Sequence, residues 1–437
     1  MIVIFSDLDL RGSGYMNITI ALANQLATRF DREVIILGMG YSGAAHDWPF
    51  KIIPVKPGQA FQHASAMLQN LITLGTGGLN DPVEAFVCAL DVPHQEMCFT
   101  WPVLGNRSVP FIGVLPIESG PLCDTWANSL GRLDARLIIS QYGTDQCEKA
   151  GLPATHIPIG LDTEAWRMPL DGEVKQLRET MGIEPDEFAV LTVADNQERK
   201  NLSSTARSIA ILKHKHKVNV KWILVTRVGS KVGWKLADLA IEHDIVDQLV
   251  TFERGIEHSR LWILNALADA FLLTSKAEGL CMPIIEAMAC GTPVVATYAT
   301  ALMEHLQAPD GTWRGFPVKA EYVYQDPWGN SYRHFADPED AAKQLKKVHQ
   351  LIQRGKIQPY IDRGRAYAES RDWNLAGDVL NAAVEEVMAL HASRQAALQP
   401  DQQMGQTLVG PGEEEDKPLI PPTVPQAVPS QIGEVNE

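Results

Sequence analysis

The sequence predicts an α/β protein made of two Rossmann-like, doubly wound parallel-sheet domains that face a central cleft. Short apolar runs alternate with amphipathic stretches over most of the 437 residues. This alternation is typical of β-α-β units, whose strands pair in parallel. The regular pattern gives way to Pro and Asp in "IPIGLDTEAWRMPLDGE" (157–173), which indicates a junction between two such domains.

The apolar runs fall into two series of predicted strands. The first series comprises 1–7, 33–39, 51–55, 85–91, 110–117, 135–140 and 156–160. The second comprises 188–195, 220–226, 248–252, 270–275, 292–297 and 315–320. Helix-like patterns fall between most of these strands, for example at 14–30, 200–213, 232–243 and 258–268, and three further helices are predicted at 338–354, 357–369 and 373–392. We therefore expect an N-terminal domain over 1–160 and a C-terminal domain over 161–372.

The last segment, 395–437, has a different composition, rich in Gln, Pro, Glu and Val. It contains too little apolar surface to offset the entropy of ordering, so we predict a disordered tail.

Charge and cysteine usage narrow the class of protein. The formal net charge is −15, which disfavours broad contact with nucleic acid or anionic membrane. None of the six cysteines has C-x-x-C spacing, so we expect reduced thiols and a cytoplasmic location. The first apolar run lacks a basic segment before it and predicts a strand rather than a signal peptide, and no run is long enough to cross a membrane.

Two carboxylates flank a predicted strand-to-helix turn in "EGLCMPIIEAMACGTPVVAT" (278–297). Glu278 follows the strand at 270–275, and Glu286 lies in the helix that Pro283 can begin. Ligands of open α/β sheets bind at the carboxyl ends of strands, where helix N-termini attract anions. Carboxylates at this place can accept hydrogen bonds from sugar hydroxyls.

This stretch resembles the E-x7-E motif of family 4 glycosyltransferases, which are retaining enzymes with the GT-B fold. The similarity extends over most of 1–390 and includes four further segments: "GTDQCEKAGLPATHIPIGLDTEAW", "VLTVADNQERKNL", "HFADPEDAAKQL" and "ESRDWNLAGDVL". The resemblance implies transfer of a sugar from a nucleotide-diphosphate sugar with retained anomeric configuration. It also implies that the helix at 373–392 crosses back to the N-terminal domain.

The resemblance assigns roles to residues of the C-terminal domain. Glu278 would hold a hydroxyl of the donor sugar, and Glu286 would accept from the ribose hydroxyls. The donor would also contact backbone amides of Gly279, Leu280 and Cys281.

The family's phosphate loop has an arginine five residues before a lysine. Lys200 matches the lysine, but Asp195 stands in the arginine's place, and the adjacent Arg199 is our candidate for the missing cation. Two cations on a diphosphate would stabilise the charge that grows on the leaving group. Arg254, which follows a predicted strand, is a further candidate donor contact.

The N-terminal domain contains a second candidate phosphate-binding loop and candidate residues for binding the acceptor. Gly12 and Gly14 permit close approach to a phosphate before the helix at 14–30. Asp91, His94 and Glu118 follow the fourth and fifth strands and are candidate catalytic residues, and Asp91 or Glu118 would orient the acceptor hydroxyl.

The same domain contains Asp7 and Asp9, a D-x-D pair, which we interpret as turn residues. We expect no metal site and no cofactor besides the donor substrate.

Several alternatives stay open at the level of sequence. The Asp195 departure would also suit a non-catalytic nucleotide-sugar-binding or scaffold protein. An epimerase or phosphorylase of related fold would need acid/base or cofactor residues that are not visible. A dinucleotide oxidoreductase is disfavoured because Asn17 replaces the third glycine of G-x-G-x-x-G.

The acceptor and the donor's base and sugar cannot be predicted, and a glycan, a protein or a small molecule would each serve as acceptor. The stretch "GQAFQHASAMLQNLITLGTGG" (58–78) has no Lys or Arg, so we expect no stable membrane association. The acidic N-terminal domain makes nucleic acid an improbable acceptor, although glycosyltransferases that modify DNA bases exist.

Overall fold

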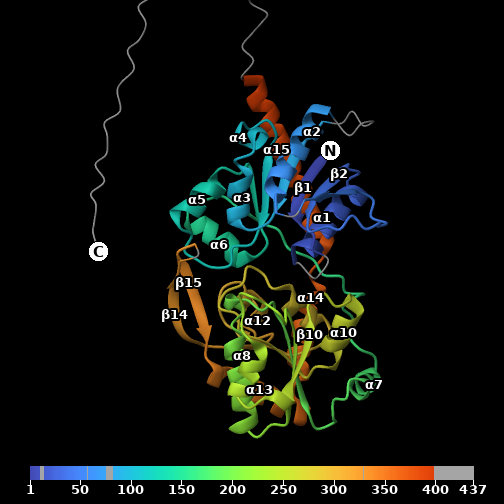
Figure 1. Ribbon diagram of the computed structural model, residues 1–437, viewed down its shortest axis with the longest axis vertical. Helices are drawn as coiled ribbons and strands as arrows, with labels where there is room; N and C mark the ends of the chain where they lie inside the picture. Colours follow the sequence, from blue (N-terminus) through green and yellow to red (C-terminus); the bar gives the residue numbers. More distant parts are fainter. Residues whose placement is uncertain (10–13, 57, 75–81, 328, 398–437) are drawn as a thin grey trace, which may run out of the picture. The chain divides into compact units, whose positions relative to one another are not determined.

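The computed structural model describes residues 1–9, 14–56, 58–74, 82–327 and 329–397. Residues Met1–Ala392 form one compact unit that contains two parallel sheets with helices around them (Figure 1). This arrangement confirms the predicted α/β fold with two doubly wound sheets. The predicted tail lies almost entirely outside the described residues.

The first sheet has the strand order β3-β2-β1-β4-β5-β6-β7, and all its strands are parallel. The strands are β1 (Ile2–Asp7), β2 (Val34–Met39), β3 (Lys51–Val55), β4 (Ala85–Ala89), β5 (Phe111–Leu115), β6 (Ala135–Ile138) and β7 (Thr155–His156). Its strand order reverses between β1 and β4, so the loops after these two strands open on a topological switch point.

The second sheet repeats the plan with the order β10-β9-β8-β11-β12-β13. Its strands are β8 (Phe188–Val193), β9 (Val220–Thr226), β10 (Leu249–Glu253), β11 (Ala270–Leu273), β12 (Val294–Thr297) and β13 (Phe316–Val318). Here the switch point falls between β8 and β11. The loops after these strands contain the predicted phosphate loop and Glu278.

Helices cover both faces of the first sheet. Alternate residues of β1 show this, because Ile2 and Ile4 pack in one apolar cluster while Val3 and Phe5 pack in another. Such two-sided burial explains why the parallel strands are continuous apolar runs. The α-helices among the described residues are α1 (Gly14–Arg29), α2 (Ala60–Leu74), α3 (Val92–Cys98), α4 (Pro102–Gly105), α5 (Asp124–Gly131), α6 (Gln141–Lys149), α7 (Glu173–Thr180), α8 (Leu202–His214), α9 (Leu236–Glu242), α10 (His258–Leu267), α11 (Met282–Ala289), α12 (Leu302–Leu306), α13 (Pro338–Gln353), α14 (Gln358–Glu369) and α15 (Trp373–Ala397).

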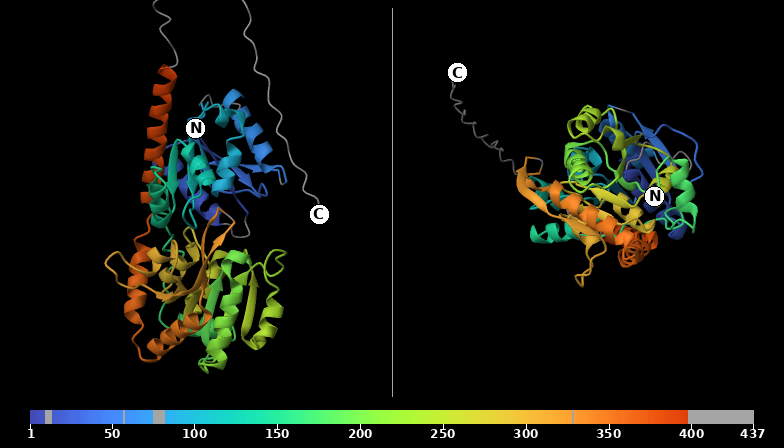
Figure 2. Two further views of the ribbon diagram at one scale, coloured as in Figure 1. Left: turned by 90° about the vertical axis from the view of Figure 1, so that its left-hand side faces the viewer. Right: turned by 90° about the horizontal axis from the view of Figure 1, so that it is seen from below.

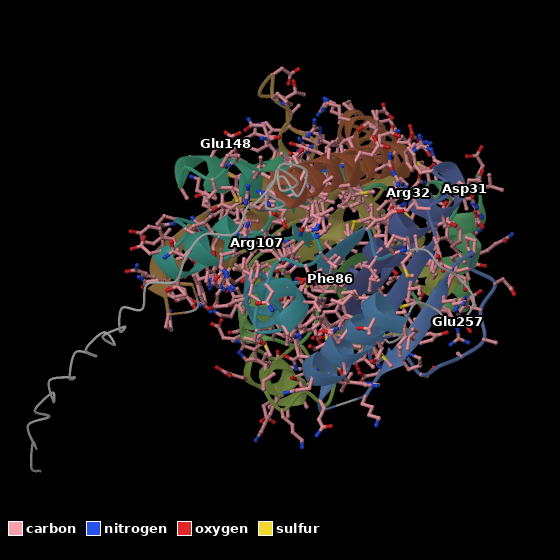
Figure 3. All side chains as sticks on the ribbon, turned by 90° about the horizontal axis from the view of Figure 1, so that it is seen from above. Asp31, Arg32, Phe86, Arg107, Glu148 and Glu257 are labelled. Carbon is pink, nitrogen blue, oxygen red and sulfur yellow. The ribbon has the colours of Figure 1, made fainter. Side chains whose placement is uncertain are left out.

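The long helix α15, drawn in red in Figure 2, runs alongside the part of the chain that contains the first sheet. Two arginines near the end of α1 contact it. Arg29 at the end of α1 donates to Asp378, and Arg32 donates to Asn381 and Glu385. Arg32 is labelled in Figure 3. The chain therefore returns from the second sheet to pack beside α1, while the predicted division into domains at 160 and 372 remains a prediction.

A hairpin after the second sheet was not predicted from the sequence. Residues between the second sheet and α13 form an antiparallel hairpin of β14 (Ala320–Asp326) and β15 (Ser331–Ala336). In the sequence "EYVYQDPWGNSYRHF", aromatic and β-branched residues, which favour strands, flank a Pro- and Gly-containing turn. The hairpin forms a sheet of its own, and Figure 1 shows it beside the second sheet.

Candidate functional site

Glu278 lies just beyond the carboxyl end of β11, at the switch point of the second sheet. Its side chain is only 5% exposed. Its backbone is held by Thr300, whose Oγ1 accepts from the Glu278 amide at 2.9 Å and donates to the Glu278 carbonyl oxygen at 3.1 Å. The carboxylate is thus buried and fixed in place.

Two cations from the loop after β8 contact this carboxylate. Lys200 Nζ lies 2.5 Å from Glu278 Oε1, and Arg199 Nη1 lies 2.9 Å from Glu278 Oε2. Both cations belong to a short 3₁₀ turn, Glu198–Lys200, which precedes α8. Asn201, between the turn and the helix, has a φ of 53°, a left-handed conformation that asparagine tolerates.

The electrostatics of this cluster favour full ionisation. Burial by itself raises the pKa of the Glu278 carboxyl, but Lys200 and Arg199 outweigh burial and lower this pKa to about 2. Glu278 is therefore a carboxylate at neutral pH, and it neutralises part of the cationic charge.

Glu118, from the loop after β5, connects the two sheets' loops. Its Oε2 lies 3.0 Å from Arg199 Nε, and its Oε1 accepts from Arg333 of the hairpin at 2.9 Å. Arg333 is 4% exposed. The predicted acceptor-side carboxylate therefore contacts the predicted phosphate-binding arginine directly.

The loop that precedes α11 approaches the first sheet closely. A Cβ added to Gly279 would lie 2.3 Å from Cβ of Pro116, so any side chain at this position would force the loop away. Cys281 has a φ of 79° and caps α11. The Leu280 carbonyl oxygen accepts from His305 Nε2 at 2.5 Å.

His305 itself acts as a positioning residue for this loop. Its Nδ1 lies 2.8 Å from the Tyr367 hydroxyl, so the imidazole bridges α14 and the Leu280 carbonyl. Burial, reinforced by the nearby Arg371, lowers the pKa of His305 to about 3. The neutral ring then donates from Nε2 and accepts at Nδ1.

Glu286 lies inside α11 and is buried. Burial alone raises the pKa of its carboxyl to about 8. In contrast to Glu278, this carboxyl is therefore largely protonated at neutral pH.

Asp195 and Arg254 are engaged in a separate ion-pair group. Asp195 Oδ2 lies 2.8 Å from Arg227 Nη2 and 3.8 Å from Arg254 Nη1. Arg254 also contacts Asp9 Oδ2 at 2.9 Å, across to the loop after β1. The acid in the family arginine's place thus has its own arginine partners, and Arg199 rather than Arg254 lies beside Lys200.

The N-terminal candidates lie near the switch point of the first sheet. Asp91, two residues after the end of β4, accepts a hydrogen bond from the Tyr15 hydroxyl. Burial, the charge of Asp91 and its hydrogen bond raise the pKa of Tyr15 well above its usual value, and the charge of Arg199 lowers it. Tyr15 therefore stays protonated and donates its hydroxyl proton to Asp91.

His94 and the glycines are less directly involved. His94 Nδ1 lies 4.0 Å from Asp91 Oδ2, and its ring stacks on Phe61. Gly14 begins α1, and an added Cβ would meet no atom within 4 Å. Gly12 lies outside the described residues.

Sequence reasoning missed Tyr15, His305 and Arg333. Tyr15 had a weak signal, because it directly follows the glycines of the first loop. Arg333 and His305 had none, since their partners are far away in the sequence.

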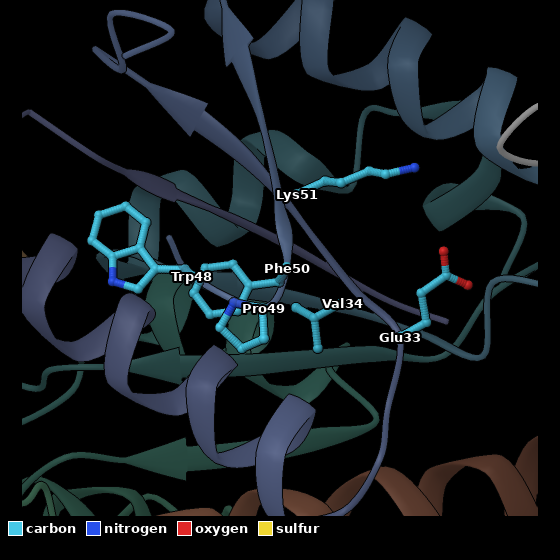
Figure 4. Close-up of a pocket in the computed structure, with 6 residues that line it drawn as sticks. All are labelled: Glu33, Val34, Trp48, Pro49, Phe50 and Lys51. Atoms are coloured by element: carbon cyan, nitrogen blue, oxygen red, sulfur yellow. The ribbon is translucent and has the colours of Figure 1, made fainter. Parts of the chain in front are cut away.

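A surface hollow of about 470 Å³ lies elsewhere, near the amino ends of β2 and β3 (Figure 4). It is lined by Glu33, Val34 and the residues from Trp48 to Lys51. The switch points lie at the carboxyl ends of the strands, so this hollow is separate from the candidate site.

Residues 173–320 match the family described as glycosyl transferases group 1. The chain is 30% identical over 168 residues to D-inositol 3-phosphate glycosyltransferase 2 of Catenulispora acidiphila, covering 37% of this chain and 38% of that protein. It is 28% identical over 155 residues to the MMP alpha-(1->4)-mannosyltransferase of Mycolicibacterium hassiacum, covering 36% of this chain and 33% of that protein. The matched stretches thus span well under half of these curated relatives.

Solved structures resemble nearly the whole chain. HepE of Anabaena, solved with UDP and glucose, has a TM-score of 0.66 at 16% identity, covering 88% of this chain and 100% of that one. Sucrose-phosphate synthase of Thermosynechococcus elongatus has a TM-score of 0.66 at 15% identity, covering 91% and 99%. The fold is therefore the GT-B fold.

The matched family segment contains Arg199, Lys200, Glu278 and Glu286 and ends at residue 320, where β14 begins. Within the described part of the chain, no helix combines the length and the apolar character that crossing a membrane requires.

Proposed function

We propose that this protein is a retaining glycosyltransferase of family 4, which transfers a sugar from a nucleotide-diphosphate sugar to a hydroxyl acceptor. The observation that carries the proposal is the contact of Arg199 and Lys200 with the buried Glu278 at the switch point of the second sheet. The group 1 family match over this segment and the GT-B fold support it.

The proposed step follows from the charges at this point. The bond between the sugar's C1 and the β-phosphate oxygen breaks, and the acceptor oxygen forms a bond to C1 on the same face. The acceptor hydroxyl's proton passes to the departing phosphate oxygen. Arg199 and Lys200 would stabilise the negative charge that grows on the diphosphate, and Glu278 would orient a sugar hydroxyl.

The N-terminal residues would act on the acceptor. Asp91 and Glu118 lie at the carboxyl ends of β4 and β5, and Glu118 already contacts Arg199. Either carboxylate would hold the acceptor hydroxyl by accepting its hydrogen bond. Loss of the Glu118–Arg199 contact on donor binding would free both groups for their substrates.

A donor screen tests the proposal. We expect slow hydrolysis of one of the UDP-, GDP-, ADP- or TDP-sugars without acceptor, and we expect the rate to persist in EDTA because the cations at the site are side chains. Released nucleoside diphosphate is the readout. Absence of hydrolysis and of calorimetric donor binding would overturn the proposal. If EDTA abolished hydrolysis and added Mn²⁺ restored it, the prediction that the reaction needs no metal ion would be overturned.

Donor binding without turnover would indicate the second candidate, a non-catalytic nucleotide-sugar-binding protein. One observation favours it, because Arg199, Lys200 and Arg254 are all paired with carboxylates. A donor phosphate would have to displace these partners. The screen separates the two candidates, since only the transferase releases nucleoside diphosphate.

The protonation of Glu286 gives a pH-dependent prediction. A carboxylate accepts ribose hydroxyls better than a carboxylic acid, so binding of the correct nucleoside diphosphate should tighten as the pH rises through the pKa of about 8. We expect a change on the order of tenfold between about pH 6 and pH 9 by calorimetry. The Glu286→Gln variant should bind the nucleoside diphosphate weakly, and its affinity should lack the pH dependence that the titration of Glu286 causes. An identical pH profile in both proteins would exclude Glu286 from the site.

A further inference from the structure

A second cavity, of about 360 Å³, lies beneath the β14–β15 hairpin. It is bounded by the hairpin, by α6, by the loop at 120–121 and by the segment from Tyr298 to Met303. Small-molecule sites have volumes of about 300–1,000 Å³, so this cavity lies within their range. The hairpin begins where the match to the group 1 family ends.

Three consecutive residues of β15 fasten the hairpin over the cavity. The hydroxyls of Ser331 and Ser119 lie 2.6 Å apart and are buried. The Tyr332 amide donates to the Gly120 carbonyl oxygen at 2.9 Å, and Arg333 donates to Glu118 at 2.9 Å.

The turn of the hairpin is also held. A Cβ added to Gly329 would lie 2.5 Å from the Trp126 ring of α5. The hairpin is therefore held in place against loops and helices of the first sheet, so the open pocket beside it has a defined shape.

The lining of the cavity combines aromatic and neutral polar groups. Tyr142, Tyr298 and Tyr332 line it together with Gln146 and His334. Burial lowers the pKa of His334, so its ring is neutral at pH 7, and its Nδ1 is buried without a hydrogen-bond partner among the described residues. No lining residue carries a full charge at neutral pH.

This chemistry selects among ligand classes. A phosphate or nucleotide would need cations, which the lining lacks. An aliphatic chain would leave the Gln146 amide and the His334 nitrogen unpaired. A sugar ring has apolar C–H faces that pack on tyrosine rings and hydroxyl edges that bond to amide and imidazole groups.

The cavity adjoins the proposed donor site. Thr300 lines the cavity, and its hydroxyl binds the backbone of Glu278 on both sides. On the hairpin, Arg333 follows Tyr332 and contacts Glu118, which contacts Arg199. The lining of the cavity is therefore connected to Glu278 through Thr300, and to Arg199 through the hairpin residue Arg333 and Glu118.

We propose that the cavity beneath the β14–β15 hairpin is an acceptor subsite that binds a neutral sugar ring of a glycan. Tyr332 and Tyr298 supply the stacking surfaces, and Gln146 and His334 supply the hydrogen bonds to ring hydroxyls. The assignment of the bound sugar as an acceptor rests on the proposed transferase function, whereas its binding does not.

The hairpin offers a matched pair of variants for the test. Tyr332 and Tyr322 are both 49% exposed and lie on neighbouring strands, but only Tyr332 lines the cavity. Saturation-transfer NMR would measure binding of maltose, cellobiose, lactose and mannobiose to the full chain with saturating UDP present. We expect one of these sugars to bind, Tyr332→Ala to weaken it about fivefold to tenfold, and Tyr322→Ala to leave it unchanged.

A second variant keeps the test valid if Tyr332→Ala disturbs the hairpin. Met303→Trp places a larger side chain in the cavity and should block the same sugar without touching the hairpin. Equal binding by all variants, or no binding of any sugar by the wild type, would overturn the subsite.

A kinetic arm separates this subsite from the proposed function. With the donor found by the screen, Tyr332→Ala should raise the acceptor KM and leave acceptor-independent donor hydrolysis unchanged. If the wild type hydrolyses no donor but Tyr332→Ala still loses sugar binding, the transferase proposal fails while the carbohydrate site stands. Loss of hydrolysis in Tyr332→Ala with unchanged sugar binding would overturn the subsite instead.

Discussion

Lys200→Ala is expected to lower kcat about 10²–10³-fold while changing the donor KM much less. The reason is that the charge on the departing diphosphate grows in the transition state, so a cation placed there stabilises the transition state more than the ground state. Steady-state kinetics with the correct donor measure both constants. Lys215→Ala is the matched control, because Lys215 directly follows α8 and pairs with the exposed Glu339. A near-wild-type kcat for Lys200→Ala would refute the diphosphate assignment.

Arg199→Ala extends the same prediction. Arg199 contacts both Glu278 and Glu118, so its removal should lower kcat and also loosen the link between the loops of the two sheets. A wild-type kcat would place Arg199 outside the reaction, as expected for a residue whose role is limited to that link.

Restoring the family's arginine by Asp195→Arg should not rescue Arg199→Ala. Asp195 is surrounded by Arg227 and Arg254, so an arginine there would bring three cations together and remove their shared carboxylate. We expect a lower melting temperature and no recovery of kcat. Recovery would show that position 195 faces the phosphates in the donor complex.

The fold was largely predictable because its signal is local. Each strand of a parallel sheet with two covered faces must be apolar along its whole length, and β1, β4, β8 and β11 all have that character in the sequence. The order of strands then follows from the doubly wound connections. The hairpin was missed because both of its faces are partly exposed: the strand register places Tyr322 on one face and Tyr332 on the other, and each is 49% exposed, so the apolar signal is correspondingly weak.

The candidate site was predictable where a motif carries it and not where only the fold does. Lys200 and Glu278 stand at spacings that the resemblance to family 4 enzymes marks. Nothing local connects Arg333 to Glu118, because the two residues lie on separate elements far apart in the sequence. Similarly, the sequence does not show that Glu278 and Glu286 differ in ionisation, because that difference arises from burial and from the cations around only one of them.

That difference leads to the second large effect, on stability. Glu278→Gln should destabilise the fold by about 3–5 kcal/mol at pH 7, because it leaves Arg199 and Lys200 beside a neutral, buried side chain. Chemical denaturation of the wild type and the variant measures the loss. Donor turnover should fall as well, since the amide accepts sugar hydroxyls less well and the cations lose their alignment.

The pH dependence of that loss has a definite sign. The folded-state pKa of Glu278 is about 2, below its ordinary value, so the stabilisation is fully present above about pH 4.5 and disappears as the pH falls toward 2. Wild type and Glu278→Gln should converge at low pH. Glu286→Gln is the contrasting variant. Because the folded-state pKa of Glu286 is about 8, the wild type loses stability as the pH rises from about 4.5 to 8. The variant has no carboxyl at this position, so its stability should increase relative to that of the wild type over the same pH range. If the stability difference from the wild type changed in the same direction with pH for both variants, the pairing of an ionised Glu278 with Arg199 and Lys200 would be refuted.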